Sequence, residues 1–348
     1  MRIGLVRAPQ RRLLAWLVLP LTLAVAMFFL LRFYDIPSVE DPDPLGIALI
    51  VLVTGLLVAS SVAAAYCILA GVDGKRSVGQ LYLLVTASLA ANYSTPVKAG
   101  IPLRVYLYKR FMGIRLGAGS ALVGLEALLG TLVPAVIALF ALVLLLPEGA
   151  LAVPAVVAAG AGLAIAAIAF VRSRPYDGVV ARLPLPGIAR RLLDPDGDIV
   201  AAVRGVPLWS LGAAAAIYTA MFLLLGVRTF YAFRLFGGSM NVIELVGISA
   251  AAFSLGSVSF VPMGLGVRDA TLVALFVQAG ADRDVAIAVA ALDRLLSTGV
   301  PLVLGILSAQ ILGLRAVLEP KRRDSRTAPV EESSEADSPL PQPVTRQS

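Results

Sequence analysis

Long runs of apolar residues, separated by short polar segments, dominate this sequence. A helix needs roughly 20 apolar residues to cross a lipid bilayer. Runs of about this length lie at 13–31, 45–70, 118–146, 151–171, 208–226 and 285–313. We therefore predict an all-α polytopic membrane protein with six full transmembrane helices.

Two further apolar segments, 79–112 and 242–280, are interrupted by proline, glycine and charge. The first contains Ser88-Leu89, six residues, and then Thr95-Pro96-Val97-Lys98-Ala99-Gly100. The second contains Ser254-Leu255, six residues, and then Val261-Pro262-Met263-Gly264-Leu265-Gly266. Serine, leucine, proline and glycine recur in register. A half-helix, a Pro/Gly turn and a returning half-helix would fit each segment, so we predict two broken or re-entrant helical hairpins.

The order span, span, hairpin, span occurs twice, in a first repeat at 13–146 and a second at 151–313. Each copy crosses the membrane an odd number of times, so the second copy starts from the opposite face. This predicts an inverted-topology repeat. Residues 1–313 then form a single transmembrane domain with a cytoplasmic connector at 172–206. The Pro/Ser/Glu-rich tail at 320–348 is predicted to be disordered and cytoplasmic.

The distribution of basic residues agrees with this topology. The sequence is 59% hydrophobic with mean hydropathy +0.89, which excludes a soluble globule. Of its 29 Lys and Arg residues, 23 fall in segments that the topology places in the cytoplasm. By the positive-inside rule we expect a multi-pass protein of the plasma membrane with both termini cytoplasmic. The remaining arginines are Arg294, inside a span, and five in outer segments: Arg32, Arg228, Arg234, Arg268 and Arg283.

Composition also limits the chemistry. The chain has no histidine and one cysteine, Cys67, which lies in an apolar run. It contains no P-loop pattern and no recognisable nucleophile–base pair. We therefore expect no metal site, no cofactor, no nucleic-acid partner and no enzymatic activity. The net charge of +7 is explained by membrane topology.

The two interruptions are the strongest candidates for a binding site. A helix that starts within the membrane exposes free N–H groups, and helix N-termini attract anions such as phosphate. Arginine adds a fork that can bind two phosphate oxygens. The alternative is that both interruptions are interfacial kinks whose basic residues obey the positive-inside rule. The predicted substrate-binding residues are Asn92, Pro96, Lys98, Gly100, Arg104, Pro262, Gly264, Gly266 and Arg268.

Acidic residues follow each interruption by about thirty positions. Glu126 lies early in one long apolar run, and Asp293 and Arg294 lie in another. Charges at such depth need a partner or a wet cavity. One pairing is Glu126 with Arg294 across the pseudo-two-fold axis, either as a structural salt bridge or as a gate or substrate contact. Asp269 is expected to neutralise Arg268.

The interruptions also resemble two motifs of one family. The stretch Gly100-Ile101-Pro102-Leu103-Arg104, followed by Lys109-Arg110, is similar to a G-x-P-x-R…R-R motif. The stretch from Pro262 to Ala270 is similar to P-x-G-L-G-x-R-E-A. Both occur in the lysylphosphatidylglycerol synthase transmembrane-region family of flippase-like proteins, and the resemblance covers about residues 10 to 315.

That resemblance implies an integral bundle that moves or binds anionic lipid. It includes no counterpart of the soluble aminoacyl-transferase domain, so lysyl transfer is not expected. Family members often carry arginine after the acid of the third long span, whereas Glu126 is followed by Ala127. This departure weakens the case for a specific charge relay there.

The leading functional hypothesis is an anionic-lipid translocase or binder. A phospholipid or polyprenyl-phosphate headgroup would enter a central polar cavity between the hairpins, where Lys98, Arg104 and Arg268 neutralise its phosphate. Rocking of the repeats would alternate access, with Glu126 and Arg294 as a gate. The alternatives are an ion-coupled secondary transporter of a small anionic solute and a non-catalytic partner of a separate cell-envelope glycosyltransferase.

Overall fold

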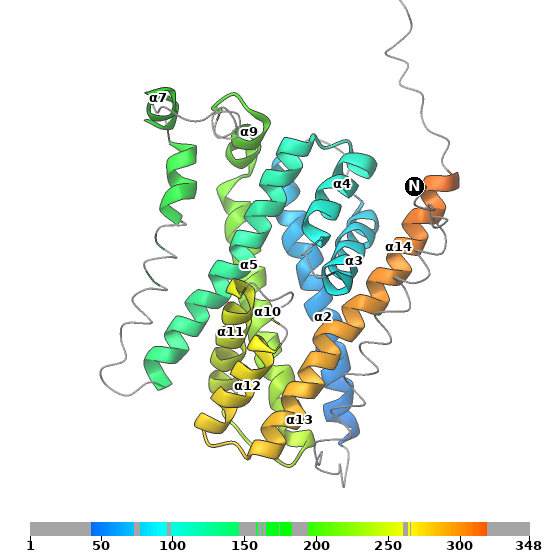
Figure 1. Cartoon of the computed structure of the whole chain (residues 1–348), viewed down its shortest axis with the longest axis vertical. Coiled ribbons are helices and arrows are strands. Elements are labelled where there is room, and N and C mark those ends of the chain that lie inside the picture. Colours follow the sequence, from blue (N-terminus) through cyan, green and yellow to red (C-terminus); the bar gives the residue numbers. More distant parts are fainter. Residues whose placement is uncertain are drawn as a thin grey trace, which may run out of the picture.

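The computed structural model is helical throughout the part of the chain that it describes. It describes residues 43–72, 77–95, 99–145, 158, 162, 165–173, 175–182, 194–259, 264 and 266–318. Within these ranges the chain forms eleven α-helices and no strand, arranged mainly as an upright bundle (Figure 1). This confirms the all-α fold class. The disordered tail predicted at 320–348 lies outside the described residues.

Four stretches of helix are long and apolar enough to cross a membrane. Three are single helices: α2 (Pro44–Ile68), α5 (Leu116–Leu145) and α10 (Leu208–Leu235). The fourth joins α13 (Arg283–Arg294), a π-helical turn (Leu295–Gly299) and α14 (Val300–Leu318). These spans make the chain an integral membrane protein. The span predicted at 13–31 lies outside the described residues, and of the span predicted at 151–171 they include a helical stretch from 165 onwards.

Helix α10 is longer than its sequence pattern predicts. The predicted span ended at residue 226, which placed Arg228 in an outer segment. In the structure the helix continues to Leu235, and Arg228 is fully buried inside it. Beyond it, Phe233 is also buried and meets Phe276 edge to face, with ring centroids 4.9 Å apart. The prediction that Arg228 lies in an outer segment was therefore wrong, because ion pairing allows this arginine to lie inside the bundle.

Each interrupted segment forms two short helices that pack against each other. The first gives α3 (Val78–Ser94) and α4 (Gly100–Met112), and the second gives α11 (Val242–Val258) and α12 (Val267–Gln278). At 1.5 Å per residue, α4 and α12 are each shorter than the roughly 30 Å hydrocarbon core. Figure 1 draws α3 and α4 in the upper half of the bundle and α11 and α12 in the lower half.

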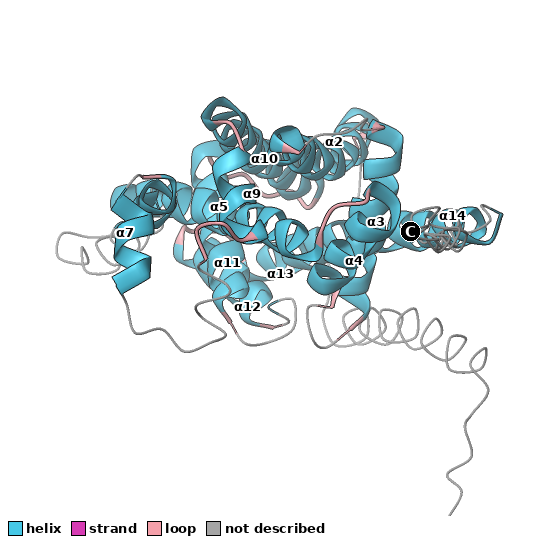
Figure 2. Ribbon diagram, turned by 90° about the horizontal axis from the view of Figure 1, so that it is seen from above, coloured by secondary structure: helices cyan, strands magenta, loops and turns pink. Residues whose placement is uncertain are grey.

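Contacts between distant parts of the sequence position these helix pairs. Helix α2 packs on α10, α3 on α14, and α5 on α11. Figure 2 shows α2 beside α10 along one side of the bundle. Between α3 and α14, the hydroxyl of Thr86 donates to that of Ser308 at 2.8 Å, and Gly305 lies so close to Thr86 that a Cβ would collide with its carbonyl oxygen.

Short helices of the predicted connector lie at one end of the bundle. They are α7 (Pro175–Arg182) and α9 (Asp198–Gly205). Elsewhere in the chain, a 3-10 turn at Leu69–Gly71 extends α2. Helix α9 packs against α5, where Arg115 donates to Asp198 at 2.9 Å. Arg204 joins the two connector helices by donating to Asp177 at 2.7 Å. The domain and repeat boundaries predicted from sequence remain predictions.

Candidate functional site

A cavity of about 380 Å³ lies where the two interrupted segments meet the long helices. Its lining comes from both halves of the sequence. Charged and polar residues of the lining include Thr54, Ser61, Asn92, Tyr93, Arg104, Glu126, Thr131, Tyr218, Arg228, Ser257, Arg268 and Ser297. Apolar residues include Leu57, Val58, Leu89, Ile101, Met221, Phe222, Leu225 and Phe253. The cavity therefore offers both ionic groups and hydrocarbon surface.

The first charged group of the cavity is an ion pair between α4 and α5. The guanidinium of Arg104 donates to the carboxylate of Glu126, and both side chains are about nine-tenths buried. The Nε of Arg104 also donates to the hydroxyl of Ser88 in α3 at 2.7 Å. Three consecutive helices thus fix this arginine. Its charge is balanced by Glu126, so the group is neutral as a whole.

The close approach of α3 and α4 explains this position of Arg104. The backbone N–H of Gly100 donates to the side-chain oxygen of Asn92 at 2.8 Å, which satisfies one free amide at the start of α4. A Cβ at Gly100 would overlap the carbonyl oxygen of Ser88 and the side chain of Asn92. Glycine is therefore required at this contact, and the contact brings Arg104 to Ser88.

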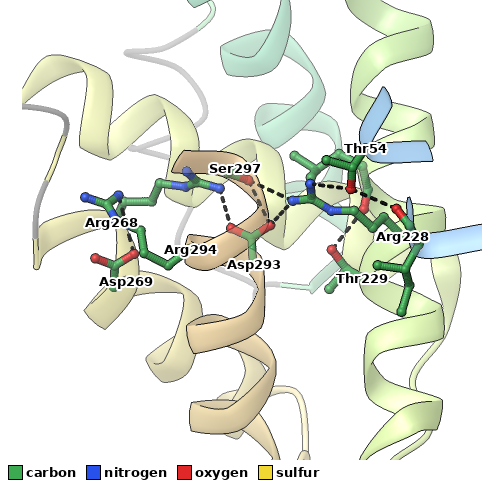
Figure 3. A network of polar contacts seen from close by, with 10 residues as sticks. Thr54, Arg228, Thr229, Arg268, Asp269, Asp293, Arg294 and Ser297 are labelled. Carbon is green, nitrogen blue, oxygen red and sulfur yellow. Dashed lines mark hydrogen bonds and ion pairs between the residues drawn. The ribbon is translucent and has the colours of Figure 1, made fainter. Parts of the chain in front are cut away.

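The second charged group centres on Asp293, which lies between two arginines. One carboxylate oxygen accepts a hydrogen bond from Arg228 of α10, and the other accepts from Arg268 of α12 (Figure 3). The Asp293 side chain is 8% exposed, and Arg228 and Arg268 are 2% and 13% exposed. Arg228 and Arg268 line the cavity, whereas Asp293 is not among its lining residues.

Arg228 is fixed by partners on three other parts of the bundle. It donates to Ser297 at 2.7 Å and to Thr54 of α2 at 3.4 Å, besides its ion pair with Asp293 (Figure 3). Ser297 lies in the π-helical turn that directly follows α13. Such turns insert an extra residue into a helix and are frequent at functional sites. Here the turn holds Ser297 and Asp293 against the same arginine.

A second ion pair lies beside this group. Arg294 and Asp269 approach within 3.7 Å, and Asp269 also accepts a hydrogen bond from the backbone N–H of Gly266 at 3.2 Å. Neither Arg294 nor Asp269 is among the residues that line the cavity. Gly264 and Gly266 both have positive φ, a conformation that glycine adopts without strain, and they lead the chain into α12.

The structure brings together several residues predicted from the sequence. Asn92, Gly100, Arg104, Glu126 and Arg268 all line the cavity. Asp269, Asp293 and Arg294 take part in ion pairs close to it, as described above, and Gly264 and Gly266 precede α12. The predicted site residues Pro96, Lys98 and Pro262 lie outside the described residues.

The predicted pairings were wrong. Glu126 pairs with Arg104 and not with Arg294, and Arg294 pairs with Asp269. Asp269 was expected to neutralise Arg268, but Asp293 does so instead. The reason is the short connection between each interrupted segment and the next helix: α4 packs against α5, and α12 against α13. Each acid therefore meets an arginine of its own half.

Sequence reasoning missed Arg228 and Ser297 as parts of the site. An arginine that follows twenty apolar or small residues reads as the end of a span, and the aromatic residues after it read as an interfacial belt. One signal was available: from Val227 to Leu235 the sequence contains no proline or glycine that would end the helix. A span extended to that residue places Arg228 at membrane depth, where it requires a partner.

The charges near the cavity leave an excess of one positive charge among the described residues. Arg104 and Glu126 cancel. Arg228, Arg268 and Arg294 face two carboxylates, Asp269 and Asp293. The described residues hold no cluster of His, Cys, Asp and Glu that could bind a metal ion. The site is thus suited to bind an anion through arginine.

Comparison with known proteins places the chain in a family. A family model described as the lysylphosphatidylglycerol synthase transmembrane region matches residues 13–305. A UPF0104 membrane protein of Pyrococcus horikoshii is 30% identical over 79 residues, which cover 23% of this chain and 24% of that protein. The matched segment thus spans about a quarter of the relative. Because the family model matches most of the chain, the chain belongs to the family of the lysylphosphatidylglycerol synthase transmembrane region.

Proposed function

We propose that this protein binds an anionic lipid in the central cavity and translocates it across the membrane. The observation that carries the proposal is a cavity of about 380 Å³ that is lined by residues of both interrupted segments and lies beside a group that, among the described residues, has one more arginine than carboxylates. Buried arginine without a matching carboxylate favours an anion as ligand. The family assignment to a lipid-synthase membrane region agrees with a lipid ligand.

The apolar part of the lining favours a lipid over a small anionic solute. Leu57 and Val58 of α2, Phe222 and Leu225 of α10, and Phe253 of α11 all reach the cavity. A small hydrated anion gains nothing from such surface, whereas acyl or polyprenyl chains do. An amphipathic ligand can contact the arginines and these side chains together.

An inverted-topology repeat with two re-entrant hairpins is part of the proposal. Helix α3 packs on α14, the last helix of the second half, and α11 packs on α5, the last long helix described in the first half. The ion pairs are also related, because Arg104 with Glu126 and Arg268 with Asp293 each join an interrupted segment to the next helix. Reciprocal contacts of this kind support a pseudo-two-fold relation between the halves.

In the proposed mechanism, the headgroup enters the cavity while its hydrocarbon chains remain beside the apolar lining. Rocking of one repeat against the other then opens the cavity to the opposite leaflet. Arg104 with Glu126 and Arg268 with Asp293 each stay within one repeat, whereas the hydrogen bond from Arg228 to Thr54 joins the two repeats and changes with this movement. Because Arg228 and Thr54 both line the cavity, a phosphate there competes directly for a contact that joins the two repeats.

A liposome assay tests the proposal. The purified protein is reconstituted with fluorescent phosphatidylglycerol, and transfer between leaflets is followed by chemical quenching of the outer label. We expect transfer above the rate of protein-free liposomes and a decrease of at least about tenfold for Arg268→Gln, because buried arginine–phosphate contacts are worth more than about 1.4 kcal/mol.

The matched control is Arg115→Gln. Arg115 carries the same charge but is 79% exposed and pairs with Asp198 away from the cavity. We expect this variant to transfer lipid at the rate of the unmodified protein. Transfer no faster than in protein-free liposomes, while a known translocase is active in the same preparation, would refute the proposal.

A further inference from the structure

We infer that the cavity selects lipids whose phosphate is a phosphodiester with a single negative charge and discriminates against phosphomonoesters. This inference rests on the proposed function, since it specifies the ligand of the same site. It comes from the arrangement of Arg228, Arg268 and Asp293, in which one carboxylate holds two cavity-lining arginines.

The first argument is charge. The group formed by Arg228, Arg268, Arg294, Asp269 and Asp293 carries one net positive charge among the described residues. A phosphodiester brings one negative charge and makes the group neutral. A doubly ionised phosphomonoester leaves one uncompensated negative charge beside this buried group. Burying an unpaired charge is costly, so the diester is favoured.

The second argument is geometry. Asp293 holds Arg228 with one oxygen and Arg268 with the other, so the two guanidinium groups lie on either side of one small anionic group (Figure 3). A phosphodiester likewise presents two free oxygens from one atom. Both arginines line the cavity while Asp293 does not, so a phosphate in the cavity reaches the same two cations from the open side.

The third argument is a donor without a partner. The Nε of Arg268, like both terminal nitrogens of Arg294, is buried and makes no hydrogen bond with any described residue, but of these two arginines Arg268 is the one that lines the cavity. The equivalent donor of the first half, the Nε of Arg104, is satisfied by Ser88 at 2.7 Å. A buried, unsatisfied donor in a charged group is costly. A phosphate oxygen beside Arg268 supplies the missing acceptor, whereas Arg104 needs none.

Asp293 therefore sets the charge for which the cavity is selective. If its charge is removed, the group carries two net positive charges, and the balance then favours a doubly charged phosphate. Asp269 provides the comparison. It belongs to the same group, but it faces Arg294, and neither residue lines the cavity. Removing its charge alters the cavity-lining arginines only indirectly.

A binding experiment on the unmodified protein tests the inference without any variant. The full chain is placed in phosphatidylcholine nanodiscs, and affinity is measured for phosphatidylmethanol and phosphatidic acid with identical acyl chains. These lipids differ by one methyl ester. Phosphatidylmethanol keeps one charge from pH 5 to pH 9, while a phosphomonoester gains its second charge with a pKa of about 6 or somewhat above.

We expect the affinity for phosphatidic acid to fall by at least about tenfold between pH 5 and pH 9, and that for phosphatidylmethanol to change by less than about threefold. Phosphatidylmethanol is the control for any protein group that titrates over this range. Phosphatidic acid that binds as tightly at pH 9 as at pH 5 would overturn the inference.

A pair of variants then locates the selectivity. Asp293→Asn and Asp269→Asn remove the same charge from the same group. At pH 9 we expect Asp293→Asn to reverse the preference toward phosphatidic acid and Asp269→Asn to retain the preference for phosphatidylmethanol. Equal shifts in both variants, or no shift in either, would contradict the role of Asp293. If Asp293→Asn is not recovered folded, the pH experiment decides alone.

The outcomes separate this inference from the proposed function. If neither lipid binds the unmodified protein above the phosphatidylcholine background, the proposed lipid site itself is wrong. If both bind equally at pH 9, the lipid site stands and the selectivity for a single charge is refuted.

Discussion

At the scale of single residues, the unusual feature of the bundle is that it buries arginine side chains among apolar helices. Arg104 and Arg228 are both buried, and each is held by a carboxylate and at least one hydroxyl group. Desolvation of a guanidinium costs several kcal/mol unless such partners replace water. The hydroxyl groups of Ser88, Thr54 and Ser297 are therefore part of the reason why these arginines are tolerated.

Removal of Arg228 is expected to destabilise the protein strongly. Arg228→Gln leaves Ser297 and Thr54 without a charged donor. It also removes one of the two arginines that balance the negative charge of Asp293. We expect a loss of about 3 kcal/mol in the free energy of unfolding, the range found when one partner of a buried ion pair is removed. Unfolding of the purified protein in sodium dodecyl sulfate, followed by circular dichroism, measures this change.

Arg234→Gln is the matched control for that variant. Arg234 lies on the same helix but is exposed and contacts the ring of Phe230 with a centroid distance of 5.7 Å. An exposed cation–π contact is worth about 1 kcal/mol or less. A loss for Arg228→Gln no larger than that for Arg234→Gln would show that the buried ion pair adds little stability.

The sequence identified the charged residues of the site better than it identified their partners. Glu126, Asp293, Arg104 and Arg268 stand out because charge is costly in apolar helices. Which acid meets which arginine depends on helix packing, and a single sequence does not contain it. Arg228 was misplaced because its surroundings resemble the end of a span.

At the scale of helices, the interrupted segments are held by close backbone contacts at glycine. Gly100 touches Ser88 and Asn92 between α3 and α4, and Gly264 touches Gly256 between α11 and α12. In each segment a glycine near the break lets the shorter helix approach the longer one. The glycine that recurs in register with Gly100 is Gly266, and its role differs: it has positive φ, and a Cβ there would meet nothing within 4 Å.

Gly100→Ala is expected to disturb the first interrupted segment. The added methyl group would overlap backbone and must push α4 away from α3, which moves Arg104 from Ser88. We expect a loss of about 2 kcal/mol in unfolding free energy, as for other overpacked contacts. Thermal unfolding in detergent, read by circular dichroism, measures the change.

Gly124→Ala provides the comparison. Gly124 lies on an exposed face of α5, and a Cβ there would meet nothing within 4 Å. Because alanine favours helix over glycine, we expect this variant to be as stable as the unmodified protein or slightly more stable. Equal losses of unfolding free energy in the two variants would mean that the close contact of Gly100 with α3 is not the cause of the loss.

Helix bounds were predicted well where a run of apolar residues is unbroken and less well where charged residues occur within the helix. The predicted spans at 45–70 and 118–146 agree with α2 and α5 to within two residues at each end. The span predicted at 208–226 ended nine residues early, because arginine and aromatic side chains follow. The π-helical turn after α13 has no signature in the apolar pattern.

At the scale of the whole molecule, the proposed inverted repeat places the two interrupted segments on opposite sides of the membrane. Cysteine labelling tests this orientation after Cys67 is replaced by alanine. Lys109→Cys, in α4, and Arg283→Cys, at the start of α13, both lie at exposed positions. We expect an impermeant maleimide to label the second variant in intact cells and the first only after permeabilisation.

Detection of both variants under denaturing conditions is the control for expression and reactivity. Labelling of both positions in intact cells, or of neither, would contradict the inverted arrangement. Labelling in the reverse order would keep the repeat but reverse the orientation derived from the basic residues.

The pairing of each arginine with an acid from its own half has a consequence for biogenesis. Arg104 finds Glu126 only 22 positions later, so a nascent chain can neutralise this charge before α10 has been synthesised. Arg228 and Arg268 both obtain Asp293 from the later half. Each of these arginines thus has its carboxylate partner in its own half and does not wait for an acid of the other half. We therefore expect the two halves, expressed as separate polypeptides, to insert independently and to assemble afterwards.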